Sequence, residues 1–374
     1  MLFTPRQLVE QIHDTPTRIA LAAAGGGSRA IADLLEVAGG SRTLLEAVVP
    51  YSAAAMVAFL GSRPEEFCSS LTSRAMAMAA FHRARRYEEP TAMPAGVACT
   101  ASLATDRPKH GPHRIHAAVQ TAAQTAAWHL KLHKDRRTRA EEERLAGYLT
   151  LNVVAEACGI DARLPLDLLE GERLEESRVS APPAWQDLLL GKSEVVQVGP
   201  NTAPAAAVFP GAFHPWHAGH ERMLHVAQEV LQQPVSVELS ILNVDKPPLD
   251  YLEIESRLGQ WTADQTACLT RAATFEEKSR LFPAATFVVG IDTLQRIAAP
   301  CYYGGDSSAC DNALRRLAER GCHFLVFARS VDGRFLRLGD LDLPEPLRPI
   351  CREVPPEVFR EDISSTAIRQ AQTA

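Results

Sequence analysis

The sequence lacks a hydrophobic run long enough for a membrane-spanning helix, so we expect no membrane partner. Its start lacks the basic segment followed by an apolar segment that marks a secretory signal. Positive charge is not in excess: the net charge is −6, which argues against a nucleic-acid partner on electrostatic grounds. The eight cysteines form no Cys-x-x-Cys pair and lie mostly in apolar stretches, as free thiols do in a reducing compartment. Together these absences predict a cytoplasmic protein.

Length and composition predict a globular protein of two domains. The 374 residues exceed one ordinary domain. Hydrophobic residues make up 46% of the chain and charged residues 22%, as in soluble globular proteins. Residues 166–203 are rich in proline and glutamate, and their periodicity is interrupted. We therefore predict an N-terminal domain over 1–165, an interdomain linker over 166–203 with a short helix at 184–191, and a C-terminal domain over 204–374.

One stretch of the C-terminal domain combines a buried strand, a tight turn and a helix start. The apolar run 205–209 predicts a strand, and residues 218–232 have the period of an amphipathic helix. Between them, in GAFHPWHAGH, Gly211 lets the backbone approach a ligand closely. His217 and His220 stand at the helix start, where free N–H groups and the helix dipole attract phosphate. Two imidazoles there can bond phosphoryl oxygens and gain strength as charge builds up in a transition state.

A second stretch, near the C-terminus, offers further groups for an anion. It reads ISSTAIR over residues 363–369. The hydroxyl groups of Ser364, Ser365 and Thr366 can cap a helix and stand beside its N-terminal N–H groups. Arg369, less than one turn further along, can reach the same anion with its planar fork of donors.

Both stretches also have simpler interpretations. The histidines are compatible with two surface histidines, or with zinc ligands completed by His214. The C-terminal stretch is compatible with an ordinary capped helix. Because both stretches occur in one chain, and the first lies between a strand and a helix start, we favour the anion-binding interpretation.

The first stretch resembles the GxFxPxHxGH signature of the nucleotidylyltransferase superfamily, and the second resembles its ISSTxxR element. The resemblance implies a Rossmann-like α/β domain, a doubly wound parallel sheet between two layers of helices, with ligands at the carboxyl ends of the strands. The N-terminal domain is also predicted to be α/β. In the C-terminal domain the pattern predicts strands at 205–209, 235–242, 285–291 and 322–328. It predicts helices at 218–232, 253–268, 274–281, 311–320 and 364–372.

The segments between the two signatures resemble those of nicotinamide- and nicotinate-mononucleotide adenylyltransferases. Gly290 and Asp292 follow a strand, as in the G-x-D-[ST] segment of those enzymes, and Arg329 ends the next strand, as in their vxxR element. The resemblance implies an adenylyltransferase, of the EC 2.7.7 type, in NAD biosynthesis. Such an enzyme transfers AMP from ATP to nicotinamide or nicotinate mononucleotide and releases pyrophosphate.

The resemblance also implies roles for individual residues. The catalytic residues would be His217, His220 and Arg369. The nucleotide would be bound by Gly211, Ala212, Phe213, Gly219, Gly290, Asp292, Ser364, Ser365 and Thr366. The acceptor would be bound by Lys246, Arg257 and Arg329. Mg²⁺ would accompany ATP, ligated by phosphates and water, so no metal site made of protein side chains is expected.

The N-terminal domain shows a second sequence of strand, glycine turn and helix. An apolar run over 17–24 enters Gly25-Gly26-Gly27, and a helix follows. The further pattern predicts strands near 44–52 and 96–102, helices at 53–60 and 72–87, a hairpin over 112–121 and 124–133, and a long helix over 138–158. With its VVPYS segment and the loop at Thr100, this pattern resembles the C-terminal domain of the CinA family, the nicotinamide-nucleotide amidohydrolases.

Two catalytic positions of that family differ here. Ala23 or Ala24 stands at the position of the nucleophilic serine, and Met56 stands at the position of a lysine, while Tyr51 and Thr100 remain. An alanine cannot act as a nucleophile, so we predict that this domain lacks amidohydrolase activity. Ser28 is the nearest substitute hydroxyl, and we interpret it as the N-cap of the following helix.

Other functions stay open from the sequence. The chain is alternatively a nucleotide-binding sensor or scaffold whose N-terminal domain binds a pyridine nucleotide or mediates dimerisation, so a homo-oligomer is among the partners that the sequence allows. The acceptor is alternatively phosphopantetheine, and cytidylyltransferases share the same signature. Class I aminoacyl-tRNA synthetases are disfavoured, because no KMSKS-like loop is present and the chain is acidic.

Overall fold

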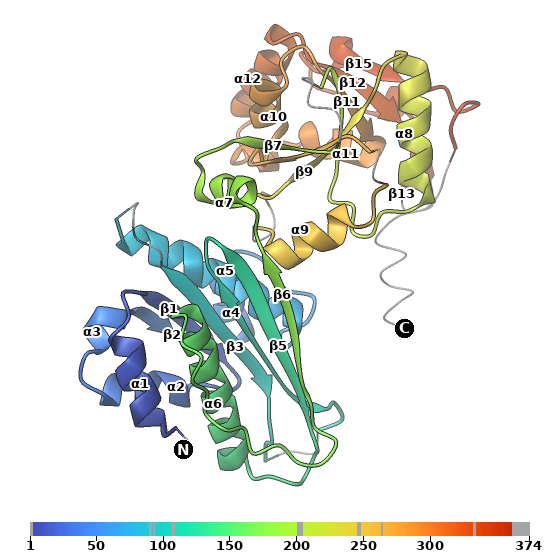
Figure 1. The fold of residues 1–374 in the computed structure, drawn as a ribbon. Coiled ribbons are helices and arrows are strands. Elements are labelled where there is room, and N and C mark those ends of the chain that lie inside the picture. The colour runs from blue at the N-terminus through green and yellow to red at the C-terminus, as the bar shows by residue number, and fades with distance from the viewer. Residues whose placement is uncertain are drawn as a thin grey trace. The chain divides into compact units, whose positions relative to one another are not determined.

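The computed structural model describes residues 3–89, 92, 94–106, 109–199, 205–244, 248–262, 265–331 and 334–360. It divides into two compact units (Figure 1). The first comprises Met1–Gln186 with Asp245–Ile254, and the second comprises Asp187–Val244 with Glu255–Ala374. Each unit contains its own sheet with helices, which confirms that both are α/β.

The sheet of the first unit has six strands in the order β2-β1-β3-β4-β5-β6. The strands are β1 (Ile19–Ala24), β2 (Leu44–Val48), β3 (Ala95–Ser102), β4 (His113–Gln120), β5 (Gln124–Leu132) and β6 (Leu174–Ser180). β1 runs parallel to β2 and β3, and the remaining pairs are antiparallel. The predicted hairpin is thus confirmed as β4 and β5, and the buried strand before the glycine turn is confirmed as β1.

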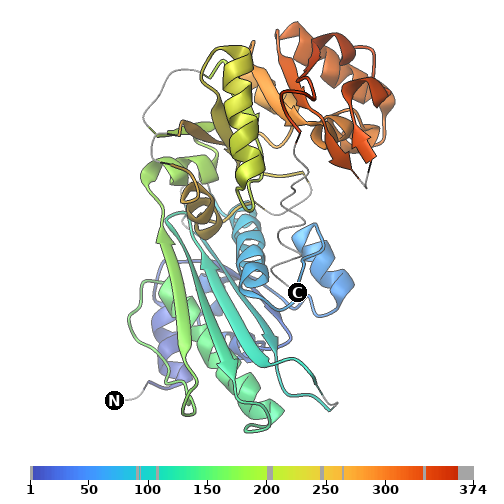
Figure 2. The same cartoon turned by 90° about the vertical axis from the view of Figure 1, so that its right-hand side faces the viewer.

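Helices cover both faces of this sheet (Figures 1 and 2). They are α1 (Pro5–His13), α2 (Arg29–Glu36), α3 (Gly40–Thr43), α4 (Ala53–Leu60), α5 (Ser70–Tyr87) and α6 (Arg139–Ala157). Successive residues of β1 point to opposite faces, so Leu21 packs in the core with α1, α2 and α6, whereas Ala22 packs with α4 and α5. α6 begins with a capping box, formed by Thr138 and Glu141.

The segment 166–203 is more ordered than the linker that we expected. The helix predicted at 184–191 is confirmed as α7 (Pro183–Leu190), but β6 joins the first sheet beside β5, and β7 (Val195–Val198) joins the second sheet. β6 is an edge strand in which only Val179 is buried. An edge strand with so little buried surface lacks the apolar alternation that identifies a strand in a sequence.

One segment that lies beyond the domain boundary expected near residue 204 belongs to the first unit. This segment comprises residues 245–254. There, Asp250 and Glu253 accept hydrogen bonds from Arg74 at 2.8 and 2.9 Å, and the Tyr251 hydroxyl donates to the carbonyl of Ala122 at 2.6 Å. Tyr251 is 1% exposed. Contacts between residues so distant in the chain leave no local pattern, so the sequence did not predict them.

The second unit has a seven-stranded sheet in the order β15-β12-β11-β8-β9-β10-β7. The further strands are β8 (Ala207–Pro210), β9 (Ser236–Ser240), β10 (Ala267–Thr270), β11 (Thr286–Gly290), β12 (His323–Phe327) and β15 (Cys351–Glu353). All neighbours are parallel except β10 and β7. The chain builds outward from β8 first through β9 and β10, then on the other side through β11, β12 and β15. This order confirms the Rossmann-like doubly wound sheet, with its switch point between β8 and β11.

Two layers of helices enclose this sheet. The helices are α8 (Ala218–Leu231), α10 (Phe275–Leu281), α11 (Ile291–Ile297) and α12 (Ser307–Glu319). A further helix, α9 (Tyr251–Leu258), begins in the first unit and ends in the second. One core combines α8 with Phe209 and Val237, and the other combines α10, α11 and α12 with Val208 and Phe287. Smaller elements are the short helices η1 (Pro300–Tyr303), η2 (Leu338–Asp340) and η3 (Arg348–Ile350) and the hairpin of β13 (Arg329–Val331) and β14 (Arg334–Leu336).

One element of this unit was predicted wrongly. The helix expected over 253–268 ends at Leu258, and residues 267–270 form the buried strand β10. A buried strand of four residues with alanine and leucine has no period that distinguishes it from a helix. The helix predicted at 364–372 lies outside the described residues.

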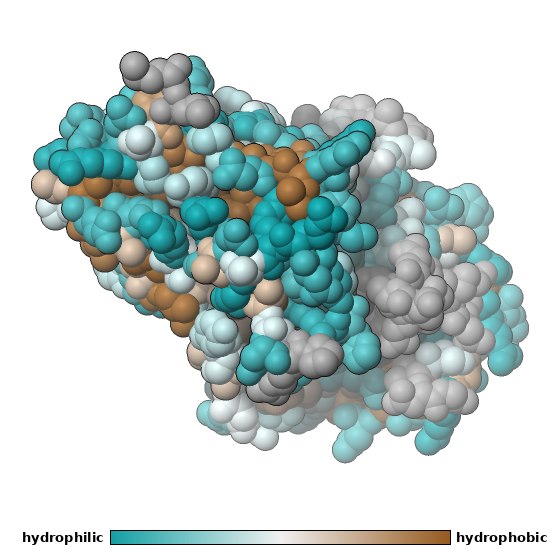
Figure 3. Space-filling model, turned by 90° about the horizontal axis from the view of Figure 1, so that it is seen from below, coloured by the Kyte–Doolittle hydropathy of each residue, from teal (hydrophilic) through white to brown (hydrophobic). Residues whose placement is uncertain are grey.

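No helix of the described residues is long and apolar enough to cross a membrane. On the face shown in Figure 3, hydrophilic residues cover most of the surface and hydrophobic residues form separate patches.

Candidate functional site

The turn from Gly211 to His217 joins β8, the strand at the switch point, to α8. The N–H of Gly211 donates to the carbonyl of Glu238 on the neighbouring β9 at 3.1 Å. A Cβ at residue 211 would lie 2.5 Å from Cζ of Phe213, so only glycine fits there. Phe213 has a left-handed backbone, with φ of 46°, and its side chain is buried. These contacts fix the backbone conformation of the turn, which lies at the carboxyl end of a central strand.

His217 is the N-cap residue of α8, and His220 lies in the first turn of that helix. The His217 carbonyl accepts from the N–H groups of His220 at 2.8 Å and of Glu221 at 3.3 Å, but its side chain does not cap the helix. The two imidazole rings stack instead, with centroids 3.7 Å apart and planes 22° apart. Both rings are thus held side by side at the start of a helix.

The protein leaves part of both rings without a hydrogen bond. The Nδ1 atoms of His217 and His220 are buried and have no partner among the described residues. Burial lowers the pKa of His220 to about 3, helped by the charges of His217 and Arg329. Burial and then Arg329 also lower the pKa of His217. At neutral pH both rings are neutral, and a buried polar atom without a partner costs free energy that a ligand can recover.

Two further strand ends bring charged groups to this place. Asp292 lies in the first turn of α11, directly after β11. Arg329 is the first residue of β13, and only Ala328 separates it from the end of β12. Arg329 Nη1 donates to Asp292 Oδ1 at 3.3 Å. A Cβ at residue 290 would lie 2.7 Å from that same oxygen, which explains the glycine there. The structure thus brings Asp292, Arg329 and Gly290 together, and the charge of Arg329 lowers the pKa of both histidines.

The other predicted site residues have different outcomes. Arg257 Nη1 donates to the carbonyl of Ala212 at 3.0 Å, so this arginine contacts the turn itself. Lys246 and the whole 363–369 stretch lie outside the described residues. The last described residues before that stretch lie close to α8. The ring of Phe359 packs on that of Phe327, and its centroid lies 5.8 Å from the guanidinium of Arg222, which is on α8.

The sequence did not predict an aromatic cluster around His220. Phe213 and Trp216 each lie 5.2 Å from its ring, and Trp261 lies 5.8 Å from Phe213. Trp216 lies inside the predicted motif, next to His217, so the sequence alone could have indicated a large aromatic ring beside the histidines. Trp261 lies 45 residues further along the chain, and no local pattern connects it with the turn.

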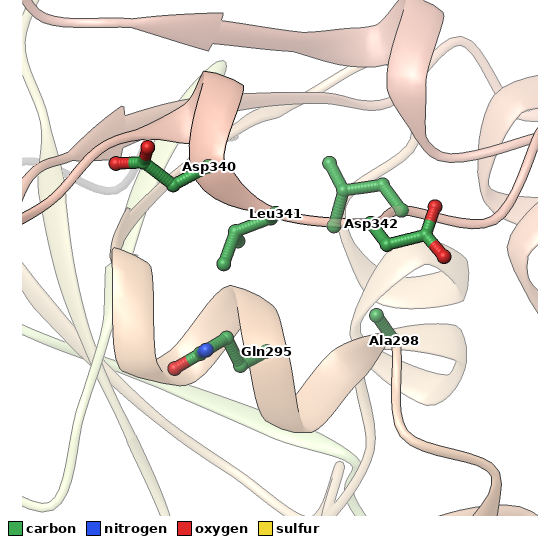
Figure 4. Close-up of a pocket in the computed structure, with 6 residues that line it drawn as sticks. Gln295, Ala298, Asp340, Leu341 and Asp342 are labelled. Atoms are coloured by element: carbon green, nitrogen blue, oxygen red, sulfur yellow. The ribbon is translucent and has the colours of Figure 1, made fainter.

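The zinc alternative has no geometric support. Within the described part of the chain, no three His, Cys, Asp or Glu side chains come close enough to hold a metal ion. A cavity of about 320 Å³ lies elsewhere in the second unit, beside α11 (Figure 4). Its lining consists of Gln295, Ala298, Asp340, Leu341, Asp342 and Leu343, and includes none of the predicted site residues.

The glycine turn of the first unit is filled by a protein carboxylate. Glu143, on α6, accepts from the N–H of Gly27 at 3.2 Å, the hydroxyl of Ser28 at 3.0 Å and the N–H of Arg29 at 3.2 Å. Ser28 is the N-cap residue of α2, as predicted, although its side chain bonds Glu143 and not the helix. The anion position of this turn is thus occupied by a side chain of the protein.

Thr100, Tyr51 and Met56, the three positions compared with the CinA family pattern, have different surroundings in the first unit. Thr100 is buried, and its hydroxyl donates to the carbonyl of Phe67 at 2.9 Å. Tyr51 is 71% exposed, whereas Met56 packs in the core with α5. Met56 thus fills a hydrophobic position and offers no charge.

Comparison with known proteins supports the assignment of the C-terminal region. Residues 208–371 match the cytidylyltransferase-like family. This region is therefore a cytidylyltransferase-like nucleotidyltransferase domain. No curated protein matches the sequence.

Solved structures resemble the N-terminal part at low identity. Competence/damage inducible protein CihA from Agrobacterium tumefaciens is 19% identical, with a TM-score of 0.31, over 42% of this chain and 98% of that one. A CinA superfamily protein from Enterobacter cloacae is 17% identical, with a TM-score of 0.33, over 42% and 94%. A CinA superfamily protein from Escherichia coli is 12% identical, with a TM-score of 0.31, over 41% of this chain and 88% of that one.

Proposed function

We propose that the C-terminal domain transfers AMP from ATP to nicotinamide or nicotinate mononucleotide and releases pyrophosphate. The observation that supports this most directly is the stacked pair of His217 and His220. Their buried Nδ1 atoms have no partner among the described residues, and they stand at a helix start on the switch-point strand. A phosphate bound there would be surrounded by N–H groups and by the positive end of the helix dipole.

In this proposal the histidines stabilise charge and need not exchange protons with the substrate. A neutral imidazole donates one N–H hydrogen bond to a phosphoryl oxygen. That bond strengthens as negative charge grows in the transition state, because the donors are already in place. The acceptor phosphate is itself a nucleophile at neutral pH, so no covalent intermediate with the protein is required. The main tasks of the domain are alignment of the reacting groups and stabilisation of charge.

The groups at the neighbouring strand ends would bind the rest of the two substrates. Arg329 offers a fork of donors for a phosphate, and Asp292 accepts from a ribose hydroxyl or an amide N–H. MgATP is the substrate, with the ion held by phosphates and water. Ser364, Ser365, Thr366 and Arg369 would hold the departing β- and γ-phosphates.

The choice of acceptor rests on the likeness of Gly290, Asp292 and Arg329 to the mononucleotide adenylyltransferase segments. The hydrogen bond between Arg329 and Asp292, and the closeness of Gly290 to the Asp292 carboxylate, support this choice. Other acceptors with a phosphate group, phosphopantetheine among them, are the alternatives.

A second candidate function concerns the first unit, which we propose to be a structural or sensing domain without amidohydrolase activity. Ala23 or Ala24 stands at the position of the missing nucleophile. The remaining hydroxyl, Ser28, donates to Glu143. That carboxylate accepts from two backbone N–H groups as well, so both it and the Ser28 hydroxyl are engaged in contacts within the protein.

A substrate panel tests the proposed function. The full chain is incubated with Mg²⁺, with ATP or CTP, and with nicotinamide mononucleotide, nicotinate mononucleotide or phosphopantetheine, and pyrophosphate release is measured. We expect turnover with ATP and a pyridine mononucleotide. Turnover only with phosphopantetheine as the acceptor, or only with CTP as the nucleotide, would contradict the proposed substrates. An absence of turnover with every pair of substrates would favour a sensor.

A further inference from the structure

The turn that carries the histidines is held by the segment Arg257–Trp261, at and after the end of α9. Arg257 donates to the carbonyl of Ala212 at 3.0 Å. The backbone N–H of Trp216 donates to Oε1 of Gln260 at 2.7 Å. Both contacts lie within the second unit. The segment therefore bonds the backbone of the turn at two points.

The backbone of the turn needs such support. Phe213 is one of the non-glycine residues with positive φ, a conformation that is unfavourable for a residue with a Cβ. Strained backbone persists where surrounding contacts determine it. Here the carbonyl just before Phe213 is bonded by Arg257, and the Phe213 ring lies edge to face with that of Trp261 at 5.8 Å.

The support extends to the catalytic histidines through aromatic contacts. The ring of His220 packs on Phe213, with planes 85° apart, and on Trp216, with planes 32° apart. His220 in turn stacks on His217. A change in the path of the turn therefore moves the two imidazoles relative to a bound phosphate.

We propose that Arg257 and Gln260 are positioning residues, which hold the turn so that His220 and His217 keep the geometry needed for phosphoryl transfer. This inference rests on the proposed function. It assigns Arg257 a role in the turn and not, as its position in the sequence suggested, at the acceptor. Gln260 is exposed and lies outside the motif. Its replacement by alanine removes two hydrogen bonds without disturbing a core: the one it accepts from the Trp216 N–H, and the one its Nε2 donates to the Ser256 carbonyl at 3.2 Å.

The test compares two substitutions of Gln260 in the full chain. Gln260→Ala removes the acceptor for the Trp216 N–H, whereas Gln260→Glu keeps an oxygen in that place. We expect kcat to fall about tenfold in Gln260→Ala, since small misplacements of catalytic groups cost one to two orders of magnitude, with KM for ATP within about twofold of wild type. We expect Gln260→Glu to recover most of kcat. Gln228→Ala, on α8, is the control and should keep the wild-type kcat.

Arg257 is tested in the same assay. Arg257→Leu removes the bond to Ala212 and should lower kcat by about tenfold, while Arg257→Lys keeps a donor and should retain part of it. An effect confined to KM for the acceptor would instead assign Arg257 to acceptor binding. A wild-type kcat in Gln260→Ala, or an equal loss in Gln260→Glu, would overturn the proposal.

A measurement without turnover separates this inference from the proposed function. NMR of the imidazole C–H groups, with His220 assigned from His220→Gln, reports the environment of the ring directly. We expect the His220 signal to shift in Gln260→Ala and to stay in place in Gln228→Ala. If the wild type transfers nothing to any acceptor, the proposed function fails. The positioning of His220 is then decided by NMR, and an unchanged signal in Gln260→Ala overturns it.

Discussion

The imidazole of His220 stacks on that of His217 with 3.7 Å between ring centroids, and Nδ1 of each ring is buried without a partner among the described residues. Stacked rings of low pKa tolerate this closeness because neither carries a charge at neutral pH. A bound polyphosphate would raise the pKa of both rings, since negative charge favours the protonated form. The pair is thus neutral when alone and prepared for an anion.

The first prediction concerns this pair. His217→Ala and His220→Ala should each lower kcat by ~10²–10³-fold, the scale of one lost preorganised donor. Pyrophosphate release is the measurement. His225→Ala is a matched control on the same helix, because His225 is exposed and pairs only with Glu229 at 3.2 Å among the interactions described for it. Wild-type turnover in both site variants would refute the assignment.

The structure modifies what we expect for folding in these variants. From the sequence, both histidines were expected to lie at a solvent-facing turn, so that their loss would leave folding unchanged. The ring of His220 instead packs on Phe213 and Trp216. His220→Ala should therefore lower the melting temperature, and His217→Ala should lower it less.

The second prediction concerns the C-terminal stretch and rests on the sequence. Arg369→Ala should raise KM for ATP and lower kcat, because a bidentate phosphate contact is lost. Arg369→Lys should recover only part, since lysine provides a single point of charge. An ATP dependence equal to that of the wild type in Arg369→Ala would show that the stretch is only structural.

The third prediction concerns the first unit. We expect no ammonia release from nicotinamide mononucleotide by the full chain, because the turn contains no available nucleophile and its anion position is filled by Glu143. Glu143→Ala should not create deamidase activity but should weaken the packing of α6 on α2, seen as a lower melting temperature. Ammonia release that disappears in Ser28→Ala would show that the unit is an active enzyme.

The fourth prediction is a loss of stability in acid that depends on a buried histidine. Burial, followed by the charges of His129 and Arg114, lowers the pKa of His116 from 6.5 to about 4. Between these values the unfolded chain binds more protons at this residue than the folded chain, so the free energy of unfolding falls as the pH falls. The contribution is complete above pH 6.5 and is lost towards pH 4.

This prediction is checked by thermal melting at several pH values. The melting temperature of the wild type should fall between pH 6.5 and pH 4, and that of His116→Gln should fall less steeply. Equal slopes in the two proteins would show that His116 does not contribute.

The sequence determined the features that local physics controls. The strand, glycine turn and helix around Gly211 and His217 follow from short-range period and from the backbone that only glycine allows, so they were predicted correctly. The capping box at Thr138 and the β4–β5 hairpin are local in the same sense. The doubly wound, mainly parallel sheet of the C-terminal domain also followed, because alternating strands and helices leave few ways to build a sheet.

Tertiary structure alone decided what depends on residues distant in the chain. The edge strand β6 exists because β5 offers it free backbone groups, although its own residues are mostly exposed and polar. Trp261 and Gln260 meet the histidine turn only when α9 is in place. The placement of Glu143 in the glycine turn likewise needs α6 and α2 to pack together. Such contacts depend on three-dimensional proximity, and a linear pattern of residue types does not contain it.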